Sequence, residues 1–116
     1  MQYGLSDTTI EKICSVLSRH SSVEKAVLYG SRAKGTFKPG SDIDLSLHGP
    51  TITLNEVGDI DSELDDLLLP YTFDLLIFNT LNHVNLREHI ERVGKIFYER
   101  GQGFQTNRSG SSNASV

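Results

Sequence analysis

Apolar residues along the chain follow two different spacings, and these separate the expected helices from the expected strands. Three segments repeat apolar residues three and four positions apart, as in a helix with one buried face: 8–20, 54–68 and a shorter one from Asn85 to Gly94. Four runs are short and rich in apolar residues, as in strands: Val23–Tyr29, Ile43–Leu47, Phe73–Phe78 and Lys95–Tyr98. A short helical turn is expected at Ser31–Lys34.

The expected helices begin and end at residues that favour helix termini. Thr8 and Glu11 have the spacing of a capping box, which predicts that the first helix begins at Thr8. Thr53 precedes the second helix and Asn85 starts the third, and both residue types are good N-caps. Gly94 is expected to end the third helix.

Each of the two long helices is expected to bury one face. In the first, this face carries Ile10, Ile13, Cys14 and Leu17, so Cys14 is interpreted as a small buried hydrophobe and not as a nucleophile. In the second, it carries Leu54, Val57, Ile60, Leu64, Leu67 and Leu68. The rest of the second helix is acidic, with no basic residue from Glu56 to Asp66. A solvated helix face is the favoured interpretation, and a docking surface for a basic partner is the alternative.

Composition and charge narrow the classes of function. The 116 residues are 37% hydrophobic and 22% charged, which is typical of one globular domain with a modest core. The net charge of −4 argues against direct binding of nucleic acid, although a nucleotide could still bind locally through a metal. The domain is expected over residues 1–100. Residues 101–116 are mostly small and polar and are expected to form a disordered tail.

The sequence also bears on localisation. The single cysteine excludes an internal disulfide and fits a reducing cytoplasm. The first residues do not combine a basic stretch with an apolar one, and no apolar run reaches membrane-spanning length. We therefore expect a cytoplasmic protein with no signal peptide and no transmembrane helix.

Three carboxylates fall where catalytic chemistry is expected. Asp42 and Asp44 lie two residues apart at the start of a strand, so both project to one face, about 6.6 Å apart along it. Asp74 lies inside the apolar run Phe73–Phe78. If its strand pairs beside theirs, the three like charges converge and repel one another unless a cation compensates them. Oxygen ligands alone favour Mg²⁺ or Mn²⁺ over zinc, and two such ions can clamp the two oxygens of an in-line displacement.

The turn after the first strand supplies the other half of such a site. Mg²⁺ usually takes further ligands from substrate phosphates, which indicates a nucleoside triphosphate. Gly30 allows backbone N–H groups to approach phosphate oxygens closely, and the Ser31 hydroxyl adds a donor. Arg32 and Lys34 can offset phosphate charge. Gly-Ser or Asp-x-Asp alone is a weak signal; the specific signal is their combination at a fixed spacing of ten residues.

This combination is similar to the signature of the DNA-polymerase-β-like nucleotidyltransferase superfamily. The short length and the form Gly-Ser-Arg-Ala-Lys-Gly resemble its minimal members, the MNT proteins, which are commonly encoded beside HEPN-domain proteins as toxin–antitoxin pairs. The resemblance covers about residues 5–100 and implies an α/β (α+β) fold with a mixed, mostly antiparallel sheet backed by helices. It implies that Asp42 and Asp44 bind both catalytic Mg²⁺ ions, and that Asp74 is a third ligand and accepts the nucleophile's proton. Gly30 and Ser31 would hold the β- and γ-phosphates, with Arg32 as a supporting contact.

The resemblance also implies a reaction and a partner. In the antitoxin members, AMP from ATP is transferred to a tyrosine hydroxyl of the HEPN ribonuclease, and pyrophosphate leaves. Since the chain has no extra helical domain to bind an acceptor, a partner protein in a hetero-oligomer is expected to supply it. Two alternatives stay open: a non-catalytic module that binds nucleotide or occludes the partner, and a subunit of an aminoglycoside-type nucleotidyltransferase. Template-directed polymerisation is disfavoured by the acidic charge.

Overall fold

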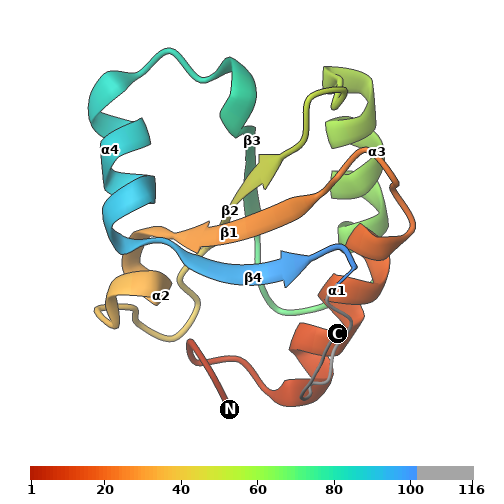
Figure 1. The fold of residues 1–116 in the computed structure, drawn as a ribbon. Coiled ribbons are helices and arrows are strands. Elements are labelled where there is room, and N and C mark those ends of the chain that lie inside the picture. The colour runs from red at the N-terminus through yellow and green to blue at the C-terminus, as the bar shows by residue number, and fades with distance from the viewer. Residues whose placement is uncertain (102–116) are drawn as a thin grey trace, which may run out of the picture.

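The protein is seen in a computed structural model that describes residues 1–101 (Figure 1). The helices are α1 (Asp7–Ser18), α2 (Gly30–Lys34), α3 (Leu54–Asp65) and α4 (Val84–Val93), with a 3₁₀ turn, η1, at Phe78–Thr80. The strands are β1 (Lys25–Tyr29), β2 (Ile43–His48), β3 (Phe73–Ile77) and β4 (Lys95–Glu99). Every strand and long helix expected from the hydrophobic pattern is therefore present, with ends that differ by up to three residues.

The four strands form one sheet in the order β3-β2-β1-β4. β1 is antiparallel to both β2 and β4, whereas β2 and β3 are parallel. Parallel neighbours need a long crossover connection, and α3 provides it between β2 and β3. The mixed, mostly antiparallel sheet backed by helices is thus confirmed.

One face of the sheet packs against α1 and α3 and holds the main core. Alternate strand residues point into it, and they have no exposed surface: Ala26, Leu28, Ile43, Leu45 and Leu47. From the helices come buried residues that include Ile13, Leu17, Ile60 and Leu64. Cys14 is in this core, 3% exposed, and burial raises the pKa of its thiol to about 11. It packs as a small hydrophobe, as expected.

The other face of the sheet packs against α4, which stands to the left of the strands in Figure 1, and against η1 and Leu81 just after it. Its apolar cluster is small, with Val27, Tyr29 and Ile90 as its buried members. Side chains alternate along β2 and β3, and the neighbours of Asp44 and Asp74 point into the main core. Both aspartates therefore lie on the α4 face, and this is the face on which the predicted chemistry must occur.

The first helix does not begin as predicted. Its N-cap is Ser6, whose hydroxyl oxygen accepts a hydrogen bond from the backbone N–H of Thr9 at 3.1 Å. Thr8 lies inside the helix, and the expected capping box with Glu11 is wrong. Ser and Thr are similarly good N-caps, so the spacing of Thr8 and Glu11 could not show that Ser6 is the N-cap instead of Thr8.

The third predicted cap is also wrong, whereas the second is confirmed. α4 begins after His83, whose Nδ1 accepts the backbone N–H of Leu86 at 3.1 Å, and Asn85 lies inside the helix. At α3, Thr53 accepts from the N–H of Glu56 and the Glu56 carboxylate accepts from the N–H of Thr53, which completes a capping box.

The predicted apolar face of the second long helix is shorter than expected. α3 ends at Asp65, and the chain then turns, with Leu68 in the left-handed region at φ +57°. Leu68 is 88% exposed, and Leu54, in the first turn of the helix, is 80% exposed. Both lie beyond the part of the helix that faces the sheet, so the buried face consists of Ile60 and Leu64, with Val57 and Leu67 half-buried beside them.

Two further expectations concern the ends of the chain and the membrane. No helix within residues 1–101 is both long enough and apolar enough to span a membrane. The predicted disordered tail, 101–116, lies outside the described residues except for Gly101.

Candidate active site

The sheet places Asp44 and Asp74 side by side. They are register partners in the parallel pair β2–β3, and Asp44 is also the partner of Tyr29 in the antiparallel pair β1–β2. Asp44 is half-buried and Asp74 is exposed. Asp74 was predicted from its strand context alone, and this register gives it the expected position beside Asp44.

Gly30 lies directly against Asp44, at the corner where β1 ends and α2 begins. Its φ is +74°, in the left-handed region that favours glycine. A Cβ atom built on Gly30 would overlap the Oδ2 atom of Asp44. Both the backbone conformation and the close approach therefore require glycine, and the predicted phosphate-binding turn adjoins the predicted metal ligands.

The pKa of Asp44 responds to the charges of its two neighbouring acids. The pKa of Asp44 is raised to about 6, mainly by burial and then by the charges of Asp74 and Asp42, with Arg32 acting in the opposite direction. The pKa of the Tyr29 hydroxyl is also raised, by burial and then by Asp74 and Asp44. The region thus has a negative potential that disfavours further negative charge and favours a cation.

Asp42 is close to this pair but is turned toward another partner. It is exposed, directly precedes β2, and accepts a hydrogen bond from the hydroxyl of Thr72. Within residues 1–101, no three His, Cys, Asp or Glu side chains lie close enough together to form a ready-made metal site. The three carboxylates are neighbours but do not converge as tightly as the sequence suggested, because like charges repel and Asp42 has a hydroxyl to accept from.

The residues at this site are suited to a divalent cation. All three candidate ligands are carboxylates, which is the donor set that Mg²⁺ and Mn²⁺ favour. Burial raises the pKa of Asp44 most, and repulsion from Asp74 and Asp42 raises it further; a bound cation would relieve this repulsion. Asp42 and Asp74 are exposed, so their side chains can reorient without displacing core residues.

Arg32 was expected to contact phosphate, and the structure gives it different partners. Its side chain is buried, with only 3% exposed. Nε and Nη2 donate to the backbone carbonyl of Ser41 at 3.2 and 2.8 Å, and Nη1 donates to the carbonyl of Tyr3 at 2.8 Å. Ser31, by contrast, is half-buried beside Gly30, while Lys34 is exposed.

His89 also joins the site. It comes from α4, and its Nε2 accepts the backbone N–H of Gly30 at 3.3 Å. Its ring also meets the ring of Tyr29 edge-on, with centroids 6.3 Å apart. No local pattern could have identified it, because its position depends on how α4 crosses the end of β1.

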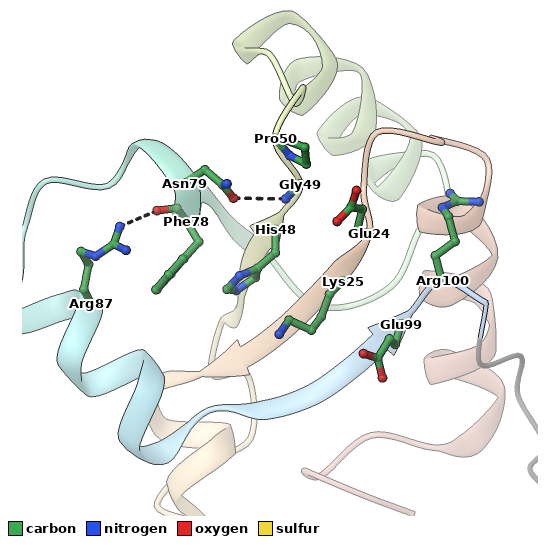
Figure 2. A pocket seen from close by; sticks show the side chains of 10 residues that line it. All are labelled: Glu24, Lys25, His48, Gly49, Pro50, Phe78, Asn79, Arg87, Glu99 and Arg100. Atoms are coloured by element: carbon green, nitrogen blue, oxygen red, sulfur yellow. Dashed lines mark hydrogen bonds between the residues drawn. The ribbon is translucent and has the colours of Figure 1, made fainter.

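A cavity of about 710 Å³ lies at the opposite end of the strands from the acids (Figure 2). It is lined in part by Lys25 and His48, which are register partners four residues along β1 from the Tyr29–Asp44 pair, or about 13 Å. His48 stacks on Phe78 at 4.4 Å, and burial followed by the charges of Lys25 and Arg87 lowers its pKa to about 4. The cavity therefore has none of the predicted carboxylates.

Solved structures with a similar fold include two toxin–antitoxin complexes. One is the crystal structure of a toxin–antitoxin with AMP-PNP, with a TM-score of 0.64 and 22% identity over 84% of this chain and 77% of that chain. The other is a tri-AMPylated Shewanella oneidensis HEPN toxin in complex with MNT antitoxin, with a TM-score of 0.63 and 19% identity over 84% of this chain and 76% of that chain. At these identities the likeness establishes the fold. No match was found among curated protein sequences.

The family model described as "Polymerase beta, Nucleotidyltransferase" matches residues 11–103, which is well over half of the chain. The match includes the Gly30 corner and all three acids. The resemblance inferred from the spacing of these residues is confirmed: the chain belongs to the polymerase β nucleotidyltransferase family and is a nucleotidyltransferase domain.

Proposed function

We propose that this protein is a Mg²⁺-dependent nucleotidyltransferase that transfers AMP from ATP to a tyrosine hydroxyl of a HEPN-domain toxin and thereby acts as its antitoxin. One observation carries the proposal: Asp44 lies directly against the Gly30 corner and is the register partner of Asp74, in a chain of the nucleotidyltransferase family. The similar fold of an AMPylated HEPN toxin's MNT antitoxin supports the choice of partner.

In this proposal Asp42, Asp44 and Asp74 hold two divalent cations, which when bound neutralise phosphate charge and activate the α-phosphorus as Lewis acids. The Gly30 backbone N–H and the Ser31 hydroxyl hold the β- and γ-phosphates. Asp74 accepts the proton of the attacking hydroxyl. The hydroxyl oxygen then forms a bond to the α-phosphorus, the bond from this phosphorus to the β-phosphate oxygen breaks, and pyrophosphate leaves.

The openness of the site supports an acceptor carried by another protein. Asp42 and Asp74 are exposed, so a tyrosine on a partner surface can approach them from solvent. The 710 Å³ cavity lies at the far end of the strands and so cannot present a small acceptor to these acids. A partner that brings its own tyrosine fits this arrangement better than a small molecule does.

Label transfer tests the proposal. The purified protein is incubated with ATP labelled with ³²P at the α-phosphate, Mg²⁺ and lysate from its own source, beside the variants Asp42→Asn and Asp59→Asn. Asp59 is an exposed acid of α3 outside the site and serves as the matched control. Label on one protein band with wild type and Asp59→Asn, and none with Asp42→Asn, is expected. Label confined to small molecules would contradict the choice of acceptor and favour an aminoglycoside-type enzyme.

A second candidate function is a non-catalytic module that binds nucleotide or occludes its partner. The observation that favours it is the loose arrangement of the three acids, which within residues 1–101 do not form a ready-made metal site. The same experiment separates the two functions. A partner that co-purifies with the protein, but never acquires label, would favour occlusion.

A further inference from the structure

Arg32 is an unusually well-fixed charged residue beside the candidate site. Its guanidinium carbon lies 5.2 Å from the ring centroid of Phe37 and 5.0 Å from that of Tyr71. All three of its nitrogens donate to backbone carbonyl oxygens of Tyr3 and Ser41. A buried arginine rarely persists without such hydrogen bonds, because an uncompensated buried charge is costly.

The two carbonyl groups come from segments far apart in the sequence. Tyr3 belongs to the N-terminal turn that precedes α1, and Ser41 is the residue directly before Asp42. Arg32 itself is in α2, next to Ser31. The side chain of Arg32 therefore connects three segments: the N-terminal turn, α2, and the loop that ends at Ser41.

The same contacts argue against a direct phosphate contact by Arg32. A guanidinium that donates to carbonyl oxygens from all three nitrogens, and that is buried near two aromatic rings, cannot reach a phosphate without leaving its site. Arg32 does act on the acids through its charge, since it opposes the other influences on Asp44. Arg32 thus acts on the site in two ways: through its hydrogen bonds to Ser41 and through the electrostatic effect of its charge on Asp44.

We propose that Arg32 is a positioning residue: it fixes the end of the loop between α2 and β2 so that Asp42 is held beside Asp44. This rests on the proposed function and replaces the expected phosphate contact of Arg32. Because Asp42 is exposed and outside the strand, the carbonyl of Ser41 is the nearest fixed point of its backbone on the N-terminal side. Loss of the hydrogen bonds from Arg32 to Ser41 should make the Asp42 carboxylate more mobile and should therefore weaken cation binding.

The direct test replaces the fork-shaped guanidinium with a single ammonium group. Arg32→Lys keeps the charge but cannot donate to Ser41 twice and to Tyr3 at the same time. Isothermal titration with Mn²⁺, in the absence of nucleotide, should show affinity weakened about ten-fold or more. Hydrogen exchange of the metal-free protein should be faster across residues 36–42. Transfer activity lost at low Mn²⁺ should recover at high Mn²⁺, which a merely unstable variant would not show.

A second pair of variants keeps the test valid if Arg32→Lys fails to fold. Gly4 has φ +75°, and a Cβ there would lie 2.9 Å from Nη1 of Arg32 and overlap the ring of Phe37. Gly101 has φ +86°, and within residues 1–101 no atom lies within 4 Å of such a Cβ, so Gly101→Ala has a similar backbone strain without a clash among these residues. Gly4→Ala should weaken Mn²⁺ binding several-fold, and Gly101→Ala should leave it within two-fold of wild type.

The outcomes separate this inference from the proposed function. Unchanged Mn²⁺ affinity in Arg32→Lys, together with weaker binding of a non-hydrolysable ATP analogue, would overturn positioning and restore a direct phosphate contact. Unchanged exchange across residues 36–42 in Arg32→Lys and Gly4→Ala would also overturn it. If wild type neither binds Mn²⁺ nor transfers label, the proposed function fails, and the hydrogen-exchange comparison still decides whether Arg32 holds the loop.

Discussion

On the face of the sheet toward α1 and α3, five strand residues are fully buried, and all of them are apolar. On the face toward α4, the same strands bury Val27 and Tyr29 but also carry Asp44, Asp74 and His48. The first face has an uninterrupted core, whereas the second has only a small apolar cluster between polar ends. The comparison indicates that one face of this small domain supplies the folding free energy and leaves the other available for chemistry.

The largest effect is expected from substitutions that remove a carboxylate of the site and leave the hydrophobic core unchanged. Asp42→Asn or Asp44→Asn removes a ligand charge while keeping the side-chain shape, so transfer should fall on the order of 1000-fold or more. The far-UV circular dichroism of each variant should match that of wild type. Retained transfer by either variant in the presence of Mg²⁺ would refute the assignment of the site.

A matched pair of leucine substitutions compares the stability of the two faces. Leu45 of β2 has no exposed surface on the α1/α3 face, and Leu76 of β3 is half-buried on the α4 face. Leu45→Ala should lower the free energy of unfolding by about 3 kcal/mol, and Leu76→Ala by about 1 kcal/mol. Urea denaturation measures both. Equal losses would mean that the α4 face contributes to folding as strongly as the main core does.

The smallest effect on nucleotide binding is expected from substitution of His89. This side chain accepts a hydrogen bond from a backbone N–H that a bound phosphate would otherwise use. Its Nε2 accepts the N–H of Gly30. His89→Ala frees this group at the cost of one hydrogen bond, so nucleotide should bind up to about five-fold more tightly. Calorimetry with a non-hydrolysable ATP analogue tests this. Weaker binding would show instead that His89 contributes a contact to the nucleotide.

The sequence predicted the strands and long helices because their hydrophobic periodicity is local and strong. It also indicated Asp74, because an acid inside an apolar run is costly to bury unless its charge is compensated. The strand register places Asp74 beside Asp44. The helix starts at Ser6 and His83 were missed, since several adjacent residues could act as caps.

The contacts of Arg32 and His89 could not be predicted. Arg32 is held by the carbonyl oxygens of Tyr3 and Ser41, and His89 by the N–H of Gly30. Every residue has a backbone carbonyl, so such partners leave no signature in the side-chain pattern. Their identity follows from tertiary packing alone, so the side-chain pattern next to the Gly-Ser turn predicts a phosphate contact for Arg32 and gives no sign of its carbonyl partners.

The central claim is that the carboxylates on the α4 face lower the free energy of unfolding unless a cation is bound. The raised pKa of Asp44 allows this claim to be tested directly. Its folded-state pKa is raised from 3.8 to about 6, so the metal-free protein loses stability as the pH rises from 3.8 to about 6, and the loss is complete above that range. At pH 7.5, Asp44→Asn should therefore be more stable than wild type, by about 1 kcal/mol after allowance for partial solvent exposure. Near pH 3.5 the difference should vanish, because Asp44 is then largely protonated whether the chain is folded or unfolded.

The measurement is urea denaturation of wild type and Asp44→Asn at both pH values, with and without Mn²⁺. Mn²⁺ at about 100 times its dissociation constant should stabilise wild type by about 2.7 kcal/mol at pH 7.5 and should stabilise Asp44→Asn far less. This would reverse the order of stability of the two proteins. If Asp44→Asn is instead less stable than wild type without metal, or if Mn²⁺ stabilises both equally, Asp44 is not the centre of a cation site and the account is wrong.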